Sequence, residues 1–139
     1  MTGFDAERAA IEGHIQAGFG AAPLRFENAP FTPPQDRPYA TVAIRHGAVR
    51  AVSLGPAPLL RIEGAVEVAL RAPEGSGTAP LRVLADAVSA LLRRQALSAG
   101  AAGMIRFGEA EIGAVTVEDD WRRLDVTVSF RREVVAAAP

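Results

Sequence analysis

The side chains that could perform chemistry are few, and they do not form a recognisable catalytic set. The two histidines, His14 and His46, have no acidic or nucleophilic neighbour at a spacing typical of a catalytic pair. A hydrolase elbow of the G-x-S-x-G type is absent. The chain has no cysteine, which excludes disulfides, thiolate nucleophiles and cysteine-bound metals. We therefore expect both histidines to be structural or surface residues, and we expect no enzymatic activity and no cofactor.

A glycine-rich segment, EGSGTAP at residues 74–80, comes closest to a phosphate-binding loop. Glycines before a helix can present backbone N–H groups to an anion. The segment lacks the lysine of a Walker loop and the glycine spacing of a dinucleotide-binding turn. We interpret it as a flexible connection between a strand and a helix, and we keep an anion site as the weaker alternative.

Charged residues gather late in the chain without forming a metal or nucleic-acid site. Three consecutive acids, residues 118–120, offer oxygen ligands, but such acids between two strands are typical of a solvated turn. Arginine pairs follow at 122–123 and 131–132, with Trp121 before the first. Each pair divides its side chains between two strand faces, and nearby acids offset the charge. Neither a bound metal nor sequence-specific DNA recognition is expected.

The composition is that of one globular domain. The 139 residues are 49% hydrophobic and 22% charged, with a net charge of -1. This charge gives no general attraction to nucleic acid or to an anionic membrane. All the basic residues are arginine, which we interpret as the mark of a GC-rich genome. The sequence shows no signal peptide and no long apolar run, so we expect synthesis in a bacterial cytoplasm and no membrane partner.

The strongest structural signal covers residues 59–97. Between Leu60 and Leu70 the even positions are apolar apart from Gly64, while most odd positions are charged, which predicts a strand with one dry face. Gly64 in that row indicates a bulge or a close neighbour. From Leu81 the apolar spacing changes to three and four residues, which predicts an amphipathic helix capped by Thr78.

Weaker patterns complete the predicted fold. A first helix is expected at 3–17, with Phe4, Arg8, Ile11 and Ile15 at helical spacing, and short strands at 24–28, 39–46, 104–107 and 111–117. A second strong strand begins near Trp121 and is apolar at even positions. Residues 48–54 are either the return arm of a hairpin that turns near Gly47 or a loop, and residues 132–139 are expected to fray. We predict one α+β domain over residues 1–139, with an antiparallel or mixed sheet and two main helices packed on one face.

The order of several motifs resembles the phage tail terminator-like family. These are the proline-rich segment from Asn28 to Tyr39, the R-x-x-G-x-V-x-V pattern from Arg61, the P-x-G-x-G turn at residues 73–77, the helix containing Ala85 and Asp86, and the late strand from Trp121 to Phe130. Together they span nearly the whole chain.

This resemblance implies a structural virion protein. Members of the family form a ring, expected here to have six copies, that caps the finished tail tube of a phage, prophage or gene transfer agent. The ring stops tube growth and joins the tail to the head. The implied partners are further copies of the chain, the tail tube protein and the head–tail connector protein, with DNA only as cargo in the lumen. The implied location is the head–tail junction of the virion.

Candidate site residues follow from this ring. Since acids in a lumen repel passing DNA phosphates, five acids are assigned to the channel, namely Glu109, Glu111, Glu118, Asp119 and Asp120. Contacts with neighbouring subunits or the tube are assigned to Phe31, Trp121, Arg122, Arg123, Glu74 and Ser76. The alternatives are another head–tail connector, head completion or minor tail protein, and a small ligand-binding or enzymatic α+β domain.

Overall fold

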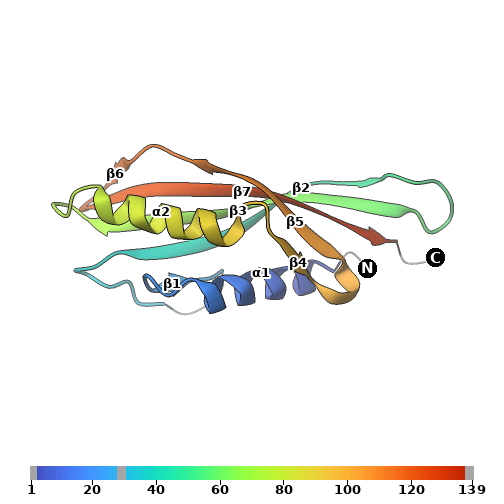
Figure 1. Cartoon of the computed structure of the whole chain (residues 1–139), viewed down its shortest axis with the longest axis horizontal. Helices are drawn as coiled ribbons and strands as arrows, with labels where there is room; N and C mark the ends of the chain where they lie inside the picture. The colour runs from blue at the N-terminus through green and yellow to red at the C-terminus, as the bar shows by residue number, and fades with distance from the viewer. Residues whose placement is uncertain (1–2, 28–30, 137–139) are drawn as a thin grey trace.

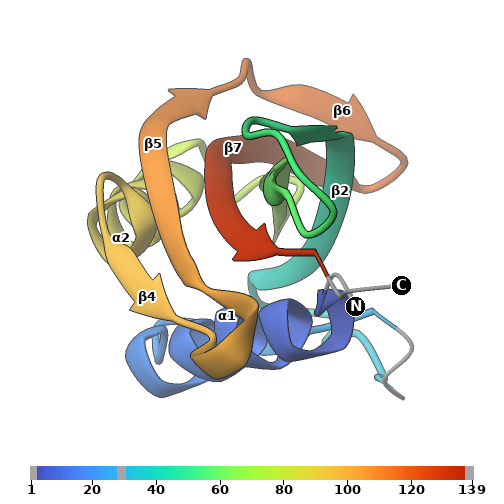
Figure 2. The same ribbon diagram turned by 90° about the vertical axis from the view of Figure 1, so that its right-hand side faces the viewer.

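The computed structural model describes residues 3–27 and 31–136, and within them it contains two α-helices and seven strands. Their order is α1 (Phe4–Gly18), β1 (Leu24–Arg25), β2 (Tyr39–Ala51), β3 (Leu59–Pro73), α2 (Ala79–Leu92), β4 (Ala96–Ser98), the 3-10 turn η1 (Gly100–Ala102), β5 (Met104–Ile112), β6 (Thr116–Glu118) and β7 (Trp121–Val135). Figures 1 and 2 show a single domain in which one curled sheet carries both helices.

The sheet is mixed, and its centre is the long pair of β3 and β7. The strands lie in the order β1-β2-β3-β7-β5-β4, while β6 pairs with β7. β1 is parallel to β2, and every other pair is antiparallel. β3 and β7 pair along their whole length, from Leu59 opposite Val135 to Pro73 opposite Trp121. The two strongest strand predictions therefore become the two central strands.

Alternation along these strands builds one hydrophobic core. The even positions of β3 and β7 are buried, including Ile62, Val66, Val68, Leu70, Leu124, Val126, Val128 and Phe130. α2 adds Leu81, Leu84, Val88 and Leu92 to the core, and α1 adds Ile11 and Ile15. The predicted phase of α2 is confirmed, because its three- and four-residue apolar row is the buried row.

Gly64 lies against close neighbours, as its place among the apolar even positions of β3 predicted. A Cβ atom at this position would lie 2.6 Å from the carbonyl oxygen of Arg45 and 2.7 Å from Cζ of Phe130. The absence of a side chain lets the Phe130 ring cross β3 at this point.

β2 does not turn at Gly47, so the suggestion of a hairpin turn there is wrong. The strand passes through Gly47 with a register shift between His46 and Val49, and it continues to Ala51. The hairpin turns later, where Gly55 adopts φ 112° among prolines. The reason is that a bulge absorbs Gly47 without reversing the strand, whereas the backbone of Gly55 has the left-handed conformation of a turn.

The expected frayed tail is also partly wrong. Residues 132–135 continue β7, because β3 supplies ladder partners from Leu59 to Ile62. Arg132 is buried, with 1% of its surface exposed, and it pairs with a carboxylate of α1. Residues 137–139 lie outside the described residues.

The ends of the other elements differ from the sequence patterns in smaller ways. β1 has two residues, and residue 28 of the predicted strand lies outside the described range. β5 passes through Gly108 as one bulged strand. Thr78 occupies the N-cap position of α2 but makes no side-chain cap bond, and the helix ends before Arg93. No helix in the described part of the chain is long and apolar enough to span a bilayer.

Candidate functional site

One end of the sheet collects aromatic side chains, and we call it the aromatic end (Phe31, Tyr39, Arg71 and Trp121). Tyr39 lies opposite Arg71, and Trp121 lies opposite Pro73, so the ladder brings the start of β2, the end of β3 and the start of β7 together. The Tyr39 ring is 5.6 Å from Phe31 and 5.2 Å from Trp121, the latter edge-on, and the Arg71 guanidinium lies over it at 5.7 Å. Two predicted contact residues, Phe31 and Trp121, thus meet through Tyr39.

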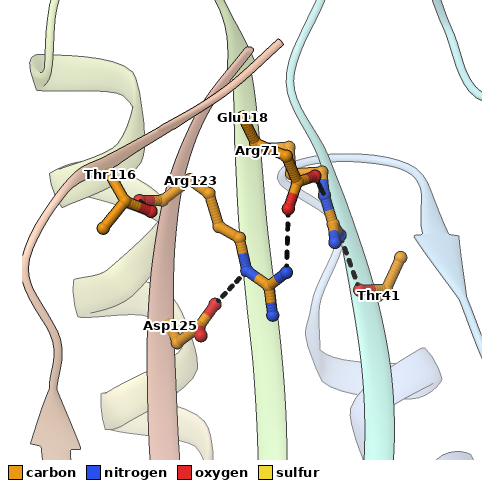
Figure 3. Close-up of polar contacts among 6 residues, drawn as sticks. All are labelled: Thr41, Arg71, Thr116, Glu118, Arg123 and Asp125. Carbon is orange, nitrogen blue, oxygen red and sulfur yellow. Dashed lines mark hydrogen bonds and ion pairs between the residues drawn. The ribbon is translucent and has the colours of Figure 1, made fainter.

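Arg71, which lies over the Tyr39 ring, also belongs to a network of polar and charged side chains, drawn in Figure 3. Glu118 accepts hydrogen bonds from Arg71 Nε and from Arg123 Nη1, each at 2.9 Å. Arg123 Nε also donates to Asp125 at 2.8 Å, and Arg71 Nη1 donates to Thr41 at 2.8 Å. This Glu118 network joins β2, β3, β6 and β7 at their common end, and it therefore fixes the shape of the surface around the aromatic end.

The hydrogen bonds of the Glu118 network favour the charged forms of Glu118 and Arg123. Hydrogen bonds from Arg71 and then Arg123 lower the pKa of Glu118 below the usual glutamate value. Hydrogen bonds to Asp125 and then Glu118 raise the pKa of Arg123. Glu118 remains 42% exposed, so its charge is partly screened by water.

Three more of the predicted contact residues, Glu74, Ser76 and Arg122, lie at the same end of the sheet, near the loop from which α2 begins. Arg122 Nη2 is 3.4 Å from Glu74 Oε1, and Arg122 Nη1 is buried without a hydrogen-bond partner among the described residues. The Ser76 hydroxyl donates to the Pro73 carbonyl at 2.5 Å, and Glu74 N donates to Asp120 O at 2.8 Å. The loop before α2 is thereby tied to the β6–β7 turn, and these bonds account for Ser76 and Glu74 as turn residues.

The five acids assigned to a channel do not form one cluster. Glu118, Asp119 and Asp120 lie at the β6–β7 turn, next to the aromatic end. Glu109 lies on β5, where it pairs with Arg93 at 2.7 Å and Arg94 at 3.5 Å. Glu111 lies further along β5 and is exposed. Within residues 3–27 and 31–136, no three His, Asp or Glu side chains are placed to hold a metal ion.

The sheet face opposite the helices is hydrophilic, and we call it the polar face (odd positions of β3 and β7 with their neighbours). Its ion pairs cross between strands, with Arg45 to Glu67 at 2.5 Å, Arg50 to Glu63 at 2.8 Å and Arg61 to Glu133 at 2.7 Å. Small side chains between these pairs leave a hollow of about 330 Å³, whose lining includes Ala65, Glu111, Thr127 and Ser129. The polar face is therefore built largely from arginines and glutamates that pair with one another, and neither histidine lines the hollow.

Both histidines bridge elements. His14 Nε2 is 3.0 Å from the carbonyl oxygen of Leu91, at the end of α2. His46 Nε2 is 2.5 Å from Oε2 of the buried Glu7, and its ring lies 4.5 Å from that of Phe4. Each ring thus connects α1 with another element.

Sequence reasoning missed one prominent surface, the hairpin tip (residues 51–60). Leu54 is fully exposed there, and Val52 is 39% exposed. Figure 1 shows the β2–β3 hairpin extending at the end of the molecule opposite β6. The available signal was the absence of any charged residue from 51 to 60 in a chain that is otherwise rich in arginine and acids. An exposed apolar tip of this kind is typical of a contact surface.

Comparisons with known proteins identify the family to which the chain belongs. One solved structure, whose description states no function, matches with a TM-score of 0.71 and 22% identity, over 97% of this chain and 96% of the other. A chain described as part of the virion of a native gene transfer agent particle matches with a TM-score of 0.58 and 21% identity, over 91% and 93%. No curated protein matches. The model of the phage tail terminator protein family matches residues 6–130. The chain therefore belongs to the phage tail terminator protein family and is a structural protein of the virion tail.

Proposed function

We propose that this protein forms a closed ring, of six copies, on the end of a finished tail tube, where it stops polymerisation and receives the head connector. The observation that carries the proposal is the family match over residues 6–130. The fold shared with a chain of a gene transfer agent virion supports it. Such a part acts by shape and valence, since it must match the tube on one side and present a different surface on the other.

The two ends of the subunit differ in the way that this task requires. β3 and β7 each have 15 residues, so they separate the hairpin tip from the aromatic end by about 50 Å at about 3.3 Å per residue. The hairpin tip is apolar and uncharged, whereas the aromatic end carries the Glu118 network. We assign these two ends to the two rims of the ring, one for the tube and one for the connector.

We further propose that the polar face lines the lumen through which DNA passes. Among the five acids, Asp119 and Asp120 have no ion pair within the described residues, so they would present full charge to DNA. Glu111 also has no ion pair within the described residues of one subunit, but an arginine of a neighbouring copy would offset its charge. Glu109 and Glu118 are offset by neighbouring arginines and would contribute less. Repulsion of phosphate by unpaired acids keeps passing DNA from binding to the wall.

The test of this function is direct observation of assembly. Light scattering coupled to gel filtration measures the mass of the purified protein, and electron microscopy shows whether it decorates tube ends. We expect rings, or caps at one end of each tube. Persistent absence from tube ends under assembly conditions contradicts termination, and binding to the connector without binding to tubes would indicate a different head–tail component.

Two substitutions test the two proposed rims separately. Leu54→Asp places a charge on the hairpin tip, and Trp121→Ala removes the largest side chain of the aromatic end. We expect each to abolish one partner's binding, to the tube or to the connector, while circular dichroism and ring mass stay unchanged. Val83→Asp is a matched control, because Val83 is 64% exposed on α2 and belongs neither to the hairpin tip nor to the aromatic end as defined above. Normal binding of both partners by both variants would show that the rims are made elsewhere.

A further inference from the structure

Two strands of the sheet have open edges, one on each side. β1 pairs with β2 only at Ala40 and Thr41, and the next outward amide, that of Ile44, donates to Glu27 Oε1 at 2.7 Å. Beyond it, residues 45–51 of β2 have no strand beside them on that side in the described ranges. On the other side, β4 pairs with β5 from Met104 to Arg106, and backbone hydrogen bonds from Phe107 N to Gln95 O and from Arg94 N to Gly108 O continue that contact. Residues 109–112 remain open in the described part of the chain. Unpaired strand edges are templates for another strand.

The directions of these edges suit a repeating contact. β2 and β7 are both antiparallel to β3, so they run the same way, and β5 is antiparallel to β7. β2 and β5 therefore run in opposite directions. If copies are related by rotation about an axis along the strands, β2 of one copy meets β5 of the next in antiparallel orientation. A contact between two different edges is head-to-tail, which is the type that closes rings.

The charges on the two edges favour this pairing over contacts between identical edges. The open part of β2 carries Arg45 and Arg50, and the open part of β5 carries Glu109 and Glu111. Arg45, Arg50 and Glu109 already have partners within the chain, at Glu67, Glu63 and Arg93, so they would share their charge with a neighbouring copy. Glu111 has no ion pair within the described residues of one copy. Pairing β2 with β2 would bring arginines together, and pairing β5 with β5 would bring acids together. Like charges opposite each other destabilise a strand pair, whereas opposite charges stabilise it. The register shift in β2 and its arginines also deter indiscriminate pairing at this edge.

We propose that residues 45–51 of β2 pair with residues 109–112 of β5 in a second copy of this chain, head to tail, to form the seam between ring subunits. This inference rests on the ring proposed above and names its contact. Ala43, Glu67, Thr127 and Glu111 share one row of the sheet, so the seam requires strands that tilt relative to the ring axis, which shifts the register between neighbouring copies by a few residues. A closed sheet needs a stagger of this kind.

Cysteine cross-linking tests the seam without background, because the natural chain has no cysteine. Two double variants place one cysteine on each edge, Ala48→Cys with Glu111→Cys and Arg50→Cys with Glu109→Cys. A short bismaleimide is added to the purified protein and to protein bound on tubes. Controls are the four single variants and the pair Leu54→Cys with Val83→Cys, which are exposed positions away from both edges.

The seam predicts a ladder of covalent oligomers that ends at the closed ring in at least one double variant. Single variants stop at the dimer, and the control pair gives no ladder. Absence of species beyond the single-variant products, in both samples, overturns the seam. Tube length is measured in parallel. If the protein caps tubes but gives no ladder of cross-linked oligomers, the seam is contradicted and the proposed function is not. If a ladder forms but tubes are not capped, the seam is supported and tail termination is contradicted.

Charge reversal gives a second readout. Glu111→Arg disturbs no ion pair within the described residues, and we expect it to lower ring formation by roughly tenfold, because it meets arginines across the seam. Adding Arg45→Glu or Arg50→Glu to Glu111→Arg is expected to recover ring formation. Asp86→Arg, an exposed acid on α2, is the control for net charge. Equal loss with Asp86→Arg, or no recovery in either double variant, contradicts pairing at this seam.

Discussion

Glu7 and Arg132 are 125 positions apart in the chain, and Arg132 Nε donates to Glu7 Oε1 at 3.0 Å. Neither side chain is exposed to solvent. Arg132 Nη1 also donates to the Ala102 carbonyl at 2.9 Å, and His46 contacts the second oxygen of Glu7. The pair therefore joins the first helix to the last strand inside the protein, where an unpartnered charge would be costly.

Breaking this pair is expected to destabilise the fold strongly. Glu7→Ala and Arg132→Met should each lower the free energy of unfolding by about 3–5 kcal/mol, because each leaves a buried charge alone. The double variant Glu7→Ala with Arg132→Met should cost less than the sum of the two, because it leaves no charge of the pair alone. Urea unfolding of the four proteins measures the coupling, and strictly additive losses would show that the two groups do not depend on each other.

Gly64→Ala tests the close approach between β3 and Phe130. The added methyl group would clash with a backbone oxygen and with the ring, so we expect a loss of about 1–3 kcal/mol in unfolding free energy. Gly13→Ala is the matched control, because a Cβ at Gly13 meets nothing within 4 Å and the residue lies within α1. That change should stabilise the protein by up to about 1 kcal/mol. Equal thermal shifts in the two variants would contradict the packing described for Gly64.

Alternation and helical spacing were sufficient to predict β3, β7 and α2, because burial on one face leaves a period in the sequence. The sequence placed Arg8 on the inner row of α1, whereas Glu7 is the buried residue. Glu7, Ile11 and Ile15 do share a four-residue spacing, but an acid in such a row is explained only by its distant partner. Arg132 lies 125 residues away, and no local pattern points to it.

Glu118→Gln should reduce stability in a pH-dependent way. The pKa of Glu118 is lowered in the folded protein, so its contribution is present above the ordinary glutamate pKa of about 4.3 and is lost as the pH falls through the lowered value. Because Glu118 is 42% exposed, we expect a loss of at most about 1 kcal/mol at pH 7. Urea unfolding at pH 7 and in acid measures this difference, with Glu111→Gln as the control for removing one acid. A loss that persists unchanged well below the lowered pKa would contradict the assignment.

Leu84→Asp tests the phase of α2. Leu84 is 5% exposed in the core, so a carboxylate there would lack a partner and the protein should lose several kcal/mol of stability. Val83→Asp, one position earlier on the exposed side, should change stability by less than about 0.5 kcal/mol. Thermal melts compare the two, and wild-type stability in Leu84→Asp would refute the buried face.

The candidate surfaces were harder to predict than the core. Trp121 occupies an odd position, out of phase with the apolar even positions of β7, and its contact with Tyr39 explains this, although no sequence spacing connects the two residues. The open edges of β2 and β5 depend on where β1 and β4 stop pairing, and strand order is a property of the whole sheet. Single-sequence patterns report which face is buried, but they do not report which edge remains free.

The central claim is that this chain terminates a tail tube. The most direct measurement is the length distribution of tubes, taken by electron microscopy, when tube protein polymerises with and without this protein. We predict shorter tubes whose capped ends stop growing after fresh tube protein is added. Tubes that keep the same length distribution and continue to grow from both ends at saturating amounts of this protein would contradict the account.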